Sequence, residues 1–146
     1  MSMLTLTASP ILLPIIALVL WTLITQGWML LARIPAMTSQ NIDISEAERT
    51  SDLAAKLPKQ VMWKADNYNH LMEQPTIFYA TALALALAGL GVDLNLMMAW
   101  VYVGSRVVHS IVHSTTNNVP IRFGLFVIGT LALLVMAVNG SIALTG

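Results

Sequence analysis

Four long apolar stretches alternate with shorter polar segments along the chain. They cover residues about 9–33, 66–90, 94–114 and 120–144. Each is suited to a helix of about 20 residues, the length that crosses a bilayer. The polar segment at about 34–63 is a connection rather than a second domain. The pattern therefore predicts an all-α fold, an integral membrane four-helix bundle of antiparallel helices in a single domain over residues 1–146.

Local signals mark where the helices end. Ser45-Glu46-Ala47-Glu48 has the spacing of a capping box and predicts a short surface helix that ends near Pro58. Gly89 and Gly91 predict a tight turn after the second apolar stretch. The polar run Thr115-Thr116-Asn117-Asn118-Val119-Pro120 separates the last two stretches. Only the first connection is therefore expected to be long.

The composition agrees with a membrane protein. Of the 146 residues, 57% are hydrophobic and 10% are charged, and the mean hydropathy is +0.75. A soluble domain would be about a quarter charged. The formal net charge is zero, so we expect no nucleic-acid partner. The chain has no cysteine, and any thiol chemistry must come from a bound molecule.

The basic residues predict the orientation in the membrane. In or beside the first connection these residues are Arg33, Arg49, Lys56, Lys59 and Lys64, and Arg122 lies at the third connection. By the positive-inside rule, the first and third connections face the cytoplasm. The N- and C-termini are then both on the non-cytoplasmic side.

Two polar stripes are predicted on neighbouring helices. Glu73 and Arg106 each lie nine residues from the expected membrane boundary, at a depth of about 13 Å. At helical spacing, Asp66, Asn69, His70, Glu73 and Thr76 share one face, and Tyr102, Arg106, His109 and His113 share another. An ionised group in hydrocarbon costs at least about 2.5 kcal/mol, so one that persists there is paired or lines a cavity.

These stripes allow two explanations. In the structural one, Glu73 pairs with Arg106 and holds the helices together, although a buried ion pair adds little net stability. In the functional one, the stripes line a polar pocket near the cytoplasmic side that binds a small charged ligand. The bilayer beside this pocket would deliver a lipophilic small molecule as substrate.

The third helix and the turn after it resemble a known family. Gly104-Ser105-Arg106-Val107-Val108-His109-Ser110-Ile111-Val112-His113, followed by Val119-Pro120-Ile121-Arg122, is similar to the membrane-associated proteins in eicosanoid and glutathione metabolism (MAPEG). The similarity is greatest to the prostaglandin E synthase branch, and with segment 69–75 and the helix layout it extends over nearly the whole chain. It implies a homotrimer that binds glutathione between subunits near the cytoplasmic side.

The resemblance also implies roles for single residues. Arg122 matches the arginine that holds the glutathione thiolate, and a permanently charged guanidinium lowers a thiol pKa from its usual value near ~8.5. Glu73 matches a glutamate of the second helix that would bind the amino group of glutathione. The other positions placed at the cofactor site are Arg33, Asn69, His70, Arg106, His109, His113 and Phe126.

Some positions depart from the family pattern. His70 stands where an asparagine precedes Glu73 by three residues, and Pro75 follows Glu73 after a single residue. His113 replaces a tyrosine, and Phe126 keeps a tyrosine's ring without its hydroxyl. These departures affect the segments that the resemblance assigns to glutathione.

Two functional hypotheses follow. The first is a glutathione-dependent membrane transferase or peroxidase-like protein acting on a lipophilic electrophile. The second is a non-catalytic MAPEG-like membrane assembly or lipid-binding protein that has lost glutathione chemistry. A separate alternative for Arg122 is a cytoplasmic anchor at a helix end.

The histidines leave two further alternatives. His109 and His113 would ligate a metal together with Asp66 or Glu73, or His70 and His113 would be axial haem ligands. The family carries histidines at such positions without a metal, so we expect none.

Overall fold

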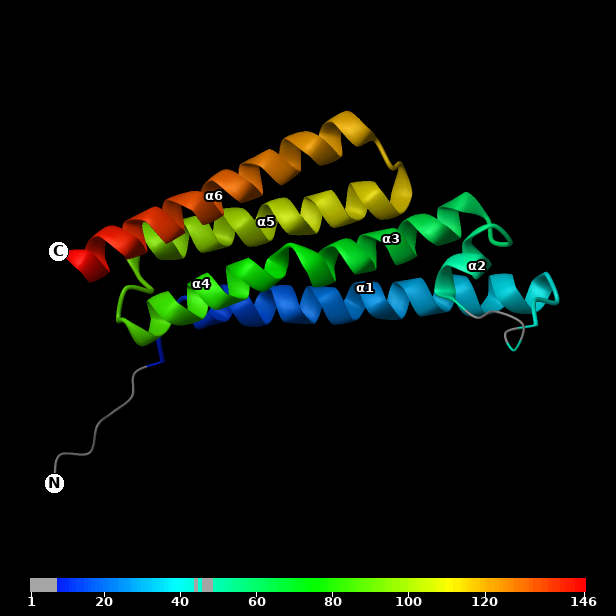
Figure 1. The fold of residues 1–146 in the computed structure, drawn as a ribbon, viewed down its shortest axis with the longest axis horizontal. Coiled ribbons are helices and arrows are strands. Elements are labelled where there is room, and N and C mark those ends of the chain that lie inside the picture. Colours follow the sequence, from blue (N-terminus) through cyan, green and yellow to red (C-terminus); the bar gives the residue numbers. More distant parts are fainter. Residues whose placement is uncertain (1–7, 44, 46–48) are drawn as a thin grey trace, which may run out of the picture.

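The computed structural model describes residues 8–43, 45 and 49–146, and every regular element in them is a helix. The helices are α1 (Leu12–Ser39), α2 (Thr50–Ala54), α3 (Lys59–Glu73), α4 (Pro75–Leu87), α5 (Asp93–Thr115) and α6 (Val119–Thr145). In Figure 1 the long helices form rods that lie side by side, and α3 and α4 follow one another end to end. The C-terminus and the α4–α5 connection lie at one end, and the α5–α6 connection lies at the other. The all-α prediction is confirmed for the described residues.

The first helix is longer than the apolar stretch that predicted it. Instead of ending at residue 33, α1 continues to Ser39 with Pro35 inside it. Proline lacks the N–H that would bond to the carbonyl of Leu31, but both residues are exposed, so the interruption does not disturb the core. The helix ends before Asn41, which adopts the left-handed conformation (φ 50°) common after helix C-termini.

The helix predicted over residues 66–90 is replaced by two helices. α3 begins earlier, at Lys59, and α4 begins at Pro75. Gln74 between them keeps helical dihedral angles (φ −69°, ψ −36°), so the chain continues in much the same direction. Pro75 has no N–H to donate to the carbonyl four residues earlier, which interrupts the hydrogen-bond pattern at this point. Part of the polar segment that we assigned to the first connection is therefore helical.

The last two helices agree with the predicted ranges within one residue at each end. Their boundaries have local causes. The side-chain oxygen of Asn118 accepts a hydrogen bond from the N–H of Ile121 at 3.1 Å and so caps α6. Pro120 lies in the first turn, where its missing N–H costs least.

The first connection contains a shorter helix than expected. Most of the predicted capping box at residues 45–48 lies outside the described residues. α2 begins after Arg49, whose N–H donates to Asp52 Oδ2 at 2.9 Å. Leu53 and Leu57 are buried, which anchors this connection to the rest of the chain.

The core lies where the rods meet, with α5 at its centre in contact with α1, α3 and α6. Leu18, Phe78, Tyr102 and Met136 come from four different helices and are completely buried. The rings of Phe78 and Tyr102 stack with their centroids 4.3 Å apart. This stacked pair packs α4 against α5.

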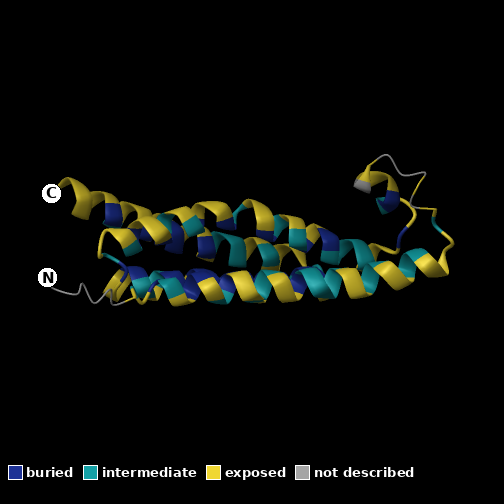
Figure 2. Ribbon diagram, turned by 90° about the horizontal axis from the view of Figure 1, so that it is seen from below, coloured by how far each residue is buried: buried dark blue, intermediate teal, exposed yellow. Residues whose placement is uncertain are grey.

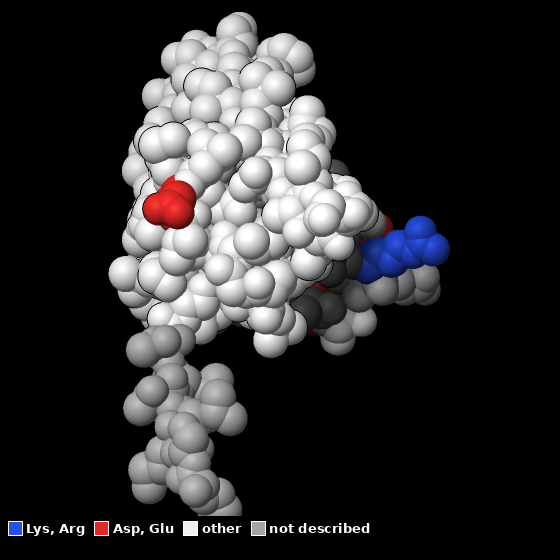
Figure 3. Space-filling view, turned by 90° about the vertical axis from the view of Figure 1, so that its left-hand side faces the viewer, with Lys and Arg blue, Asp and Glu red and all other residues white. Residues whose placement is uncertain are grey.

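Exposed positions run along the length of the helices (Figure 2), and many of them carry large apolar side chains. Leu31, Leu87 and Phe123 are 78%, 90% and 66% exposed on α1, α4 and α6. By length and composition, α1 and α6 can each cross a membrane. The end of the molecule that carries the C-terminus shows little charge (Figure 3). An apolar exterior of this extent must be covered by lipid or protein.

Gly129 allows α6 to lie close to α5. A Cβ atom there would be 2.7 Å from Ser105 Oγ, whereas one at Gly124 on the same helix would meet no atom within 4 Å. Ser105 Oγ would have to leave its hydrogen bond to the carbonyl of Tyr102.

We predict that Gly129→Ala lowers the melting temperature in detergent. Gly124→Ala is the matched control, because both changes gain the same helix propensity of about 1 kcal/mol. A Gly129→Ala protein as stable as Gly124→Ala would contradict the close contact.

Candidate functional site

A ladder of polar contacts joins α3 to α5. Its four rungs are Lys64 Nζ to Ser114 O (3.4 Å), Asn67 Nδ2 to Ser110 Oγ (2.6 Å), Arg106 Nη1 to His70 Nε2 (3.2 Å) and Tyr102 OH to Gln74 Oε1 (2.8 Å). From the first contact to the last, the residue number on the α3 side increases while that on α5 decreases, as expected for antiparallel helices. We call these contacts the α3–α5 ladder. They hold the two helices in one register.

Arg106 is the most buried charged residue of the ladder, with no exposed surface. Besides His70, its guanidinium contacts the carbonyl of Phe126 (Nη2 to O, 3.4 Å). The guanidinium carbon also lies 5.3 Å and 5.4 Å from the ring centroids of Tyr102 and Phe126. A guanidinium only donates hydrogen bonds, so Nε2 of His70 must be the acceptor. His70 is thereby held neutral, with its proton on Nδ1.

The predicted pair between Glu73 and Arg106 is not formed, and this expectation is corrected. Glu73 is exposed at the last position of α3, and Arg106 contacts His70 one helical turn earlier. We had matched the two helices by depth in the membrane, but side-chain packing sets their register. Asn69 is likewise exposed, and Asn67 occupies the buried position that faces α5.

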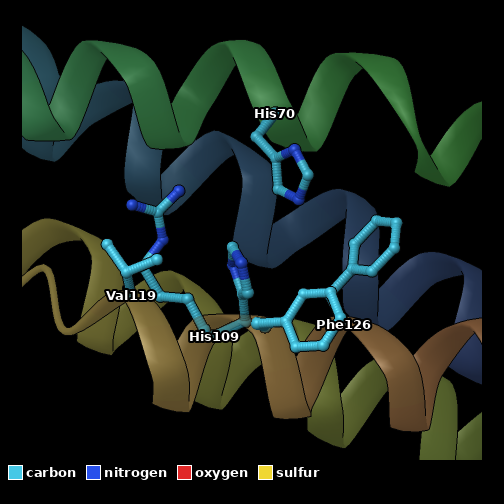
Figure 4. Close-up of a pocket in the computed structure, with 6 residues that line it drawn as sticks. His70, His109, Val119 and Phe126 are labelled. Carbon is cyan, nitrogen blue, oxygen red and sulfur yellow. The ribbon is translucent and has the colours of Figure 1, made fainter.

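A cavity of about 220 Å³ opens beside the ladder (Figure 4). Its lining residues are His70 from α3, His109 from α5, and Val119, Arg122, Phe123 and Phe126 from α6. The rings of His70 and His109 stack with centroids 4.8 Å apart. The ring of His113 lies 6.4 Å from that of His70 and 5.7 Å from that of His109. Three imidazoles thus lie close together, and those of His70 and His109 line the cavity.

No ion pair joins the cationic groups around this cavity to a carboxylate among the described residues, and Asp66 acts on Arg122 only through its charge. Arg122 donates from Nη1 to the side-chain oxygen of Asn117, and its Nε is buried without a partner. Nε of Arg106 and Nδ1 of His113 are also buried and unpaired. Buried polar groups without partners cost free energy. The arrangement therefore favours a ligand that brings negatively charged atoms.

A second cavity, of about 420 Å³, lies between α1, α2 and α3. It is lined by Arg33 and Asn69, together with Asp66 and Tyr68. Glu73 lines neither cavity. Within one chain, the residues that the sequence assigned to a single site are therefore divided among two cavities and the exposed surface.

The structure thus brings together six of the predicted site residues: His70, Arg106, His109, His113, Arg122 and Phe126. Among the described residues, no three His, Asp or Glu side chains are placed to hold a metal ion. Sequence reasoning missed Asn67, Gln74 and Asn117. Asn117 lies in the predicted break between the last two helices, whereas Asn67 and Gln74 lie in the predicted second helix but outside its polar stripe.

The comparisons with known proteins now decide the family. The sequence model of the MAPEG family matches residues 11–141, which include all six helices apart from the last turn of α6. The chain belongs to the MAPEG family. No curated protein and no solved structure matches it. Membership identifies a membrane protein of the type that acts in glutathione and eicosanoid metabolism. MAPEG proteins generally use glutathione.

The rung between Tyr102 and Gln74 can be tested on its own. Tyr102→Phe keeps the ring stacked on Phe78 but removes the hydroxyl that donates to Gln74 Oε1. We predict a loss of about 1 kcal/mol in the free energy of unfolding, because the acceptor is left unpaired. Gln74→Leu removes the other partner, and the double variant should lose less than the sum of the two. Unfolding midpoints in detergent measure all three, and additive losses would show that the rung contributes nothing.

Proposed function

We propose that this protein is a glutathione-dependent membrane transferase or peroxidase that acts on a lipophilic electrophile. The observation that carries the proposal is the position of Arg122, with an unpaired Nε, at a cavity whose polar groups are guanidinium and imidazole. Family membership supplies the cofactor class. The sequence from Gly104 to Arg122 favours the prostaglandin E synthase branch within the family.

In this proposal the residues at and beside the cavity have distinct roles. The guanidinium of Arg122 stabilises the thiolate of glutathione, because it stays charged at every physiological pH. His109 and His113 donate hydrogen bonds to carboxylate oxygens of the peptide. Arg106 is completely buried, so it acts by orienting His70. Phe126 forms an apolar wall of the cavity.

We infer that the helices cross the membrane as a four-helix bundle and that the protein is a homotrimer. The first and third connections are then cytoplasmic, and the N- and C-termini are on the other side. The exposed apolar faces of α1, α4 and α6 support this assignment, because lipid or neighbouring subunits would cover them.

The ligand would lie between subunits. The cavity at Arg122, of about 220 Å³, is smaller than the usual ~300–1,000 Å³ of small-molecule sites. Arg33, Asn69 and Glu73 lie outside this cavity, and the last two are exposed. These three residues would complete the site at the Arg122 cavity of a neighbouring subunit. The bilayer would supply the electrophile from the side.

The role of Arg122 is tested by Arg122→Ala. We predict that this change removes the ultraviolet thiolate signal of bound glutathione at neutral pH and abolishes turnover. Arg49→Ala is the matched control, because Arg49 is an exposed arginine outside the cavity. Glutathione titrations followed by absorbance and calorimetry measure the effect. If wild-type protein gives no thiolate signal, or if Arg122→Ala keeps it, the non-catalytic alternative gains.

The division of the site between subunits is tested by complementation. One variant carries Arg33→Ala with Glu73→Gln, and the other carries Arg122→Ala. Each should be inactive when expressed alone. When the two are co-expressed with different affinity tags and purified on both, we predict that turnover and the thiolate signal return, because some interfaces combine two intact halves. Mixed assemblies without either would place the whole site within one chain.

A further inference from the structure

Asn117 and Arg122 are joined across the connection between α5 and α6. α5 ends at Thr115 and α6 begins at Val119, so few residues separate the two helices. The side-chain oxygen of Asn117 accepts a hydrogen bond from Nη1 of Arg122. Among the described residues, this is the one hydrogen bond that the Arg122 side chain makes. Its Nε is buried without a partner.

We infer that Asn117 is a positioning residue: it orients the guanidinium of Arg122 toward the cavity without neutralising its charge. The inference rests on the proposed function, because it assigns a second residue to the same thiolate site. It concerns a residue that the sequence analysis treated as part of a helix break.

The backbone at Asn117 restricts which residues can perform this task. Its φ is 51°, in the left-handed region that glycine and asparagine adopt more readily than other residues. Its N–H donates to the carbonyl of Val112 at 2.7 Å, which closes the end of α5. Glycine would satisfy this backbone but has no side chain to hold Arg122. Asparagine meets both requirements.

The chemistry of the side chain matters as much as its position. An amide oxygen accepts a hydrogen bond from a guanidinium and carries no net charge. A carboxylate at the same place would accept the same bond, but it would pair with the arginine and oppose its effect on a thiolate. With Nη1 held by the neutral amide, Arg122 keeps its full positive charge at the cavity that it lines.

The neighbouring asparagine has a different task, which makes the two separable. Asn118 is exposed, and its side-chain oxygen caps α6 through the N–H of Ile121. Serine is also a good N-cap residue, so Asn118→Ser keeps this function. Asn118→Ser is therefore a matched control, one position away from Asn117 and without a contact to the guanidinium.

The test is a pH titration of the thiolate absorbance of glutathione bound to the full-length protein. For Asn117→Gly we expect the midpoint to rise by about one pH unit, a tenfold loss of thiolate below the midpoint. Asn117→Asp should raise the midpoint further, because its carboxylate pairs with Arg122. Asn118→Ser should leave the midpoint unchanged. Melting temperatures of all variants show that the proteins are folded.

A double variant separates positioning from a general effect on the fold. In the Arg122→Ala background, Asn117→Gly should cause no additional shift, because there is no guanidinium left to orient. A purely structural role of Asn117 would give the same loss in both backgrounds, and that result overturns the inference. If Asn117→Gly does not fold, Asn117→Asp retains the acceptor and the backbone preference and decides the matter by its midpoint.

The remaining outcomes distinguish the two proposals. If Arg122→Ala shifts the midpoint and Asn117→Gly does not, the inference about Asn117 is wrong and the proposed function stands. If wild-type protein shows no thiolate signal, or Arg122→Ala leaves it unchanged, both are wrong.

Discussion

The burial of a guanidinium without a carboxylate partner governs the centre of this molecule. Arg106 has no exposed surface, and its contacts are an imidazole nitrogen, a carbonyl oxygen and the faces of two aromatic rings. A charge in a low-dielectric interior is costly unless its surroundings compensate. These contacts come from α3, α5 and α6, and Gly129 gives the side chain its space on α6. The relative positions of α3, α5 and α6 therefore depend on the side chain of Arg106.

The interruption at Pro75 divides the molecule into two parts with different interactions. Gln74, just before the proline, bonds to the hydroxyl of Tyr102 and marks the last rung of the α3–α5 ladder. Before this point, α3 contacts α5 through polar side chains, many of which are buried. Beyond it, α4 packs through apolar residues such as Phe78 and Leu85. The candidate site therefore lies in the half that is held by hydrogen bonds.

Sequence reasoning succeeded where the signal lies within a single helix. The ends of α5 and α6 were predicted within one residue, because glycine, asparagine and proline stand at the turns. His109 and His113 were placed correctly on one face because four residues make about one helical turn. α1 and α3 extend beyond their apolar stretches because polar residues also adopt helical structure. α1 continues past Arg33, and α3 begins within a polar segment.

Contacts between helices were harder to predict. Whether Arg106 meets Glu73 or His70 depends on a shift of one turn between two packed helices, and sequence spacing does not contain that shift. Asn67 was overlooked because it lies one position away from the stripe that was expected to face α5. The hydrogen bond between Asn117 and Arg122 depends on the conformation of a turn, which the order of polar residues does not reveal.

The uneven distribution of charge along the rods has a consequence for how the chain enters a membrane. The connection between α4 and α5, residues 88–92, contains no ionisable side chain, and Asp93 at the start of α5 is the sole one nearby. In the proposed orientation, this hairpin tip must be translocated across the bilayer, as must the two termini. Moving each charged side chain through hydrocarbon costs at least about 2.5 kcal/mol, so a tip with one carboxylate meets a low barrier. The opposite end carries many lysine and arginine side chains, so its barrier to translocation is much higher. The direction of insertion would therefore be set by the energy of translocation.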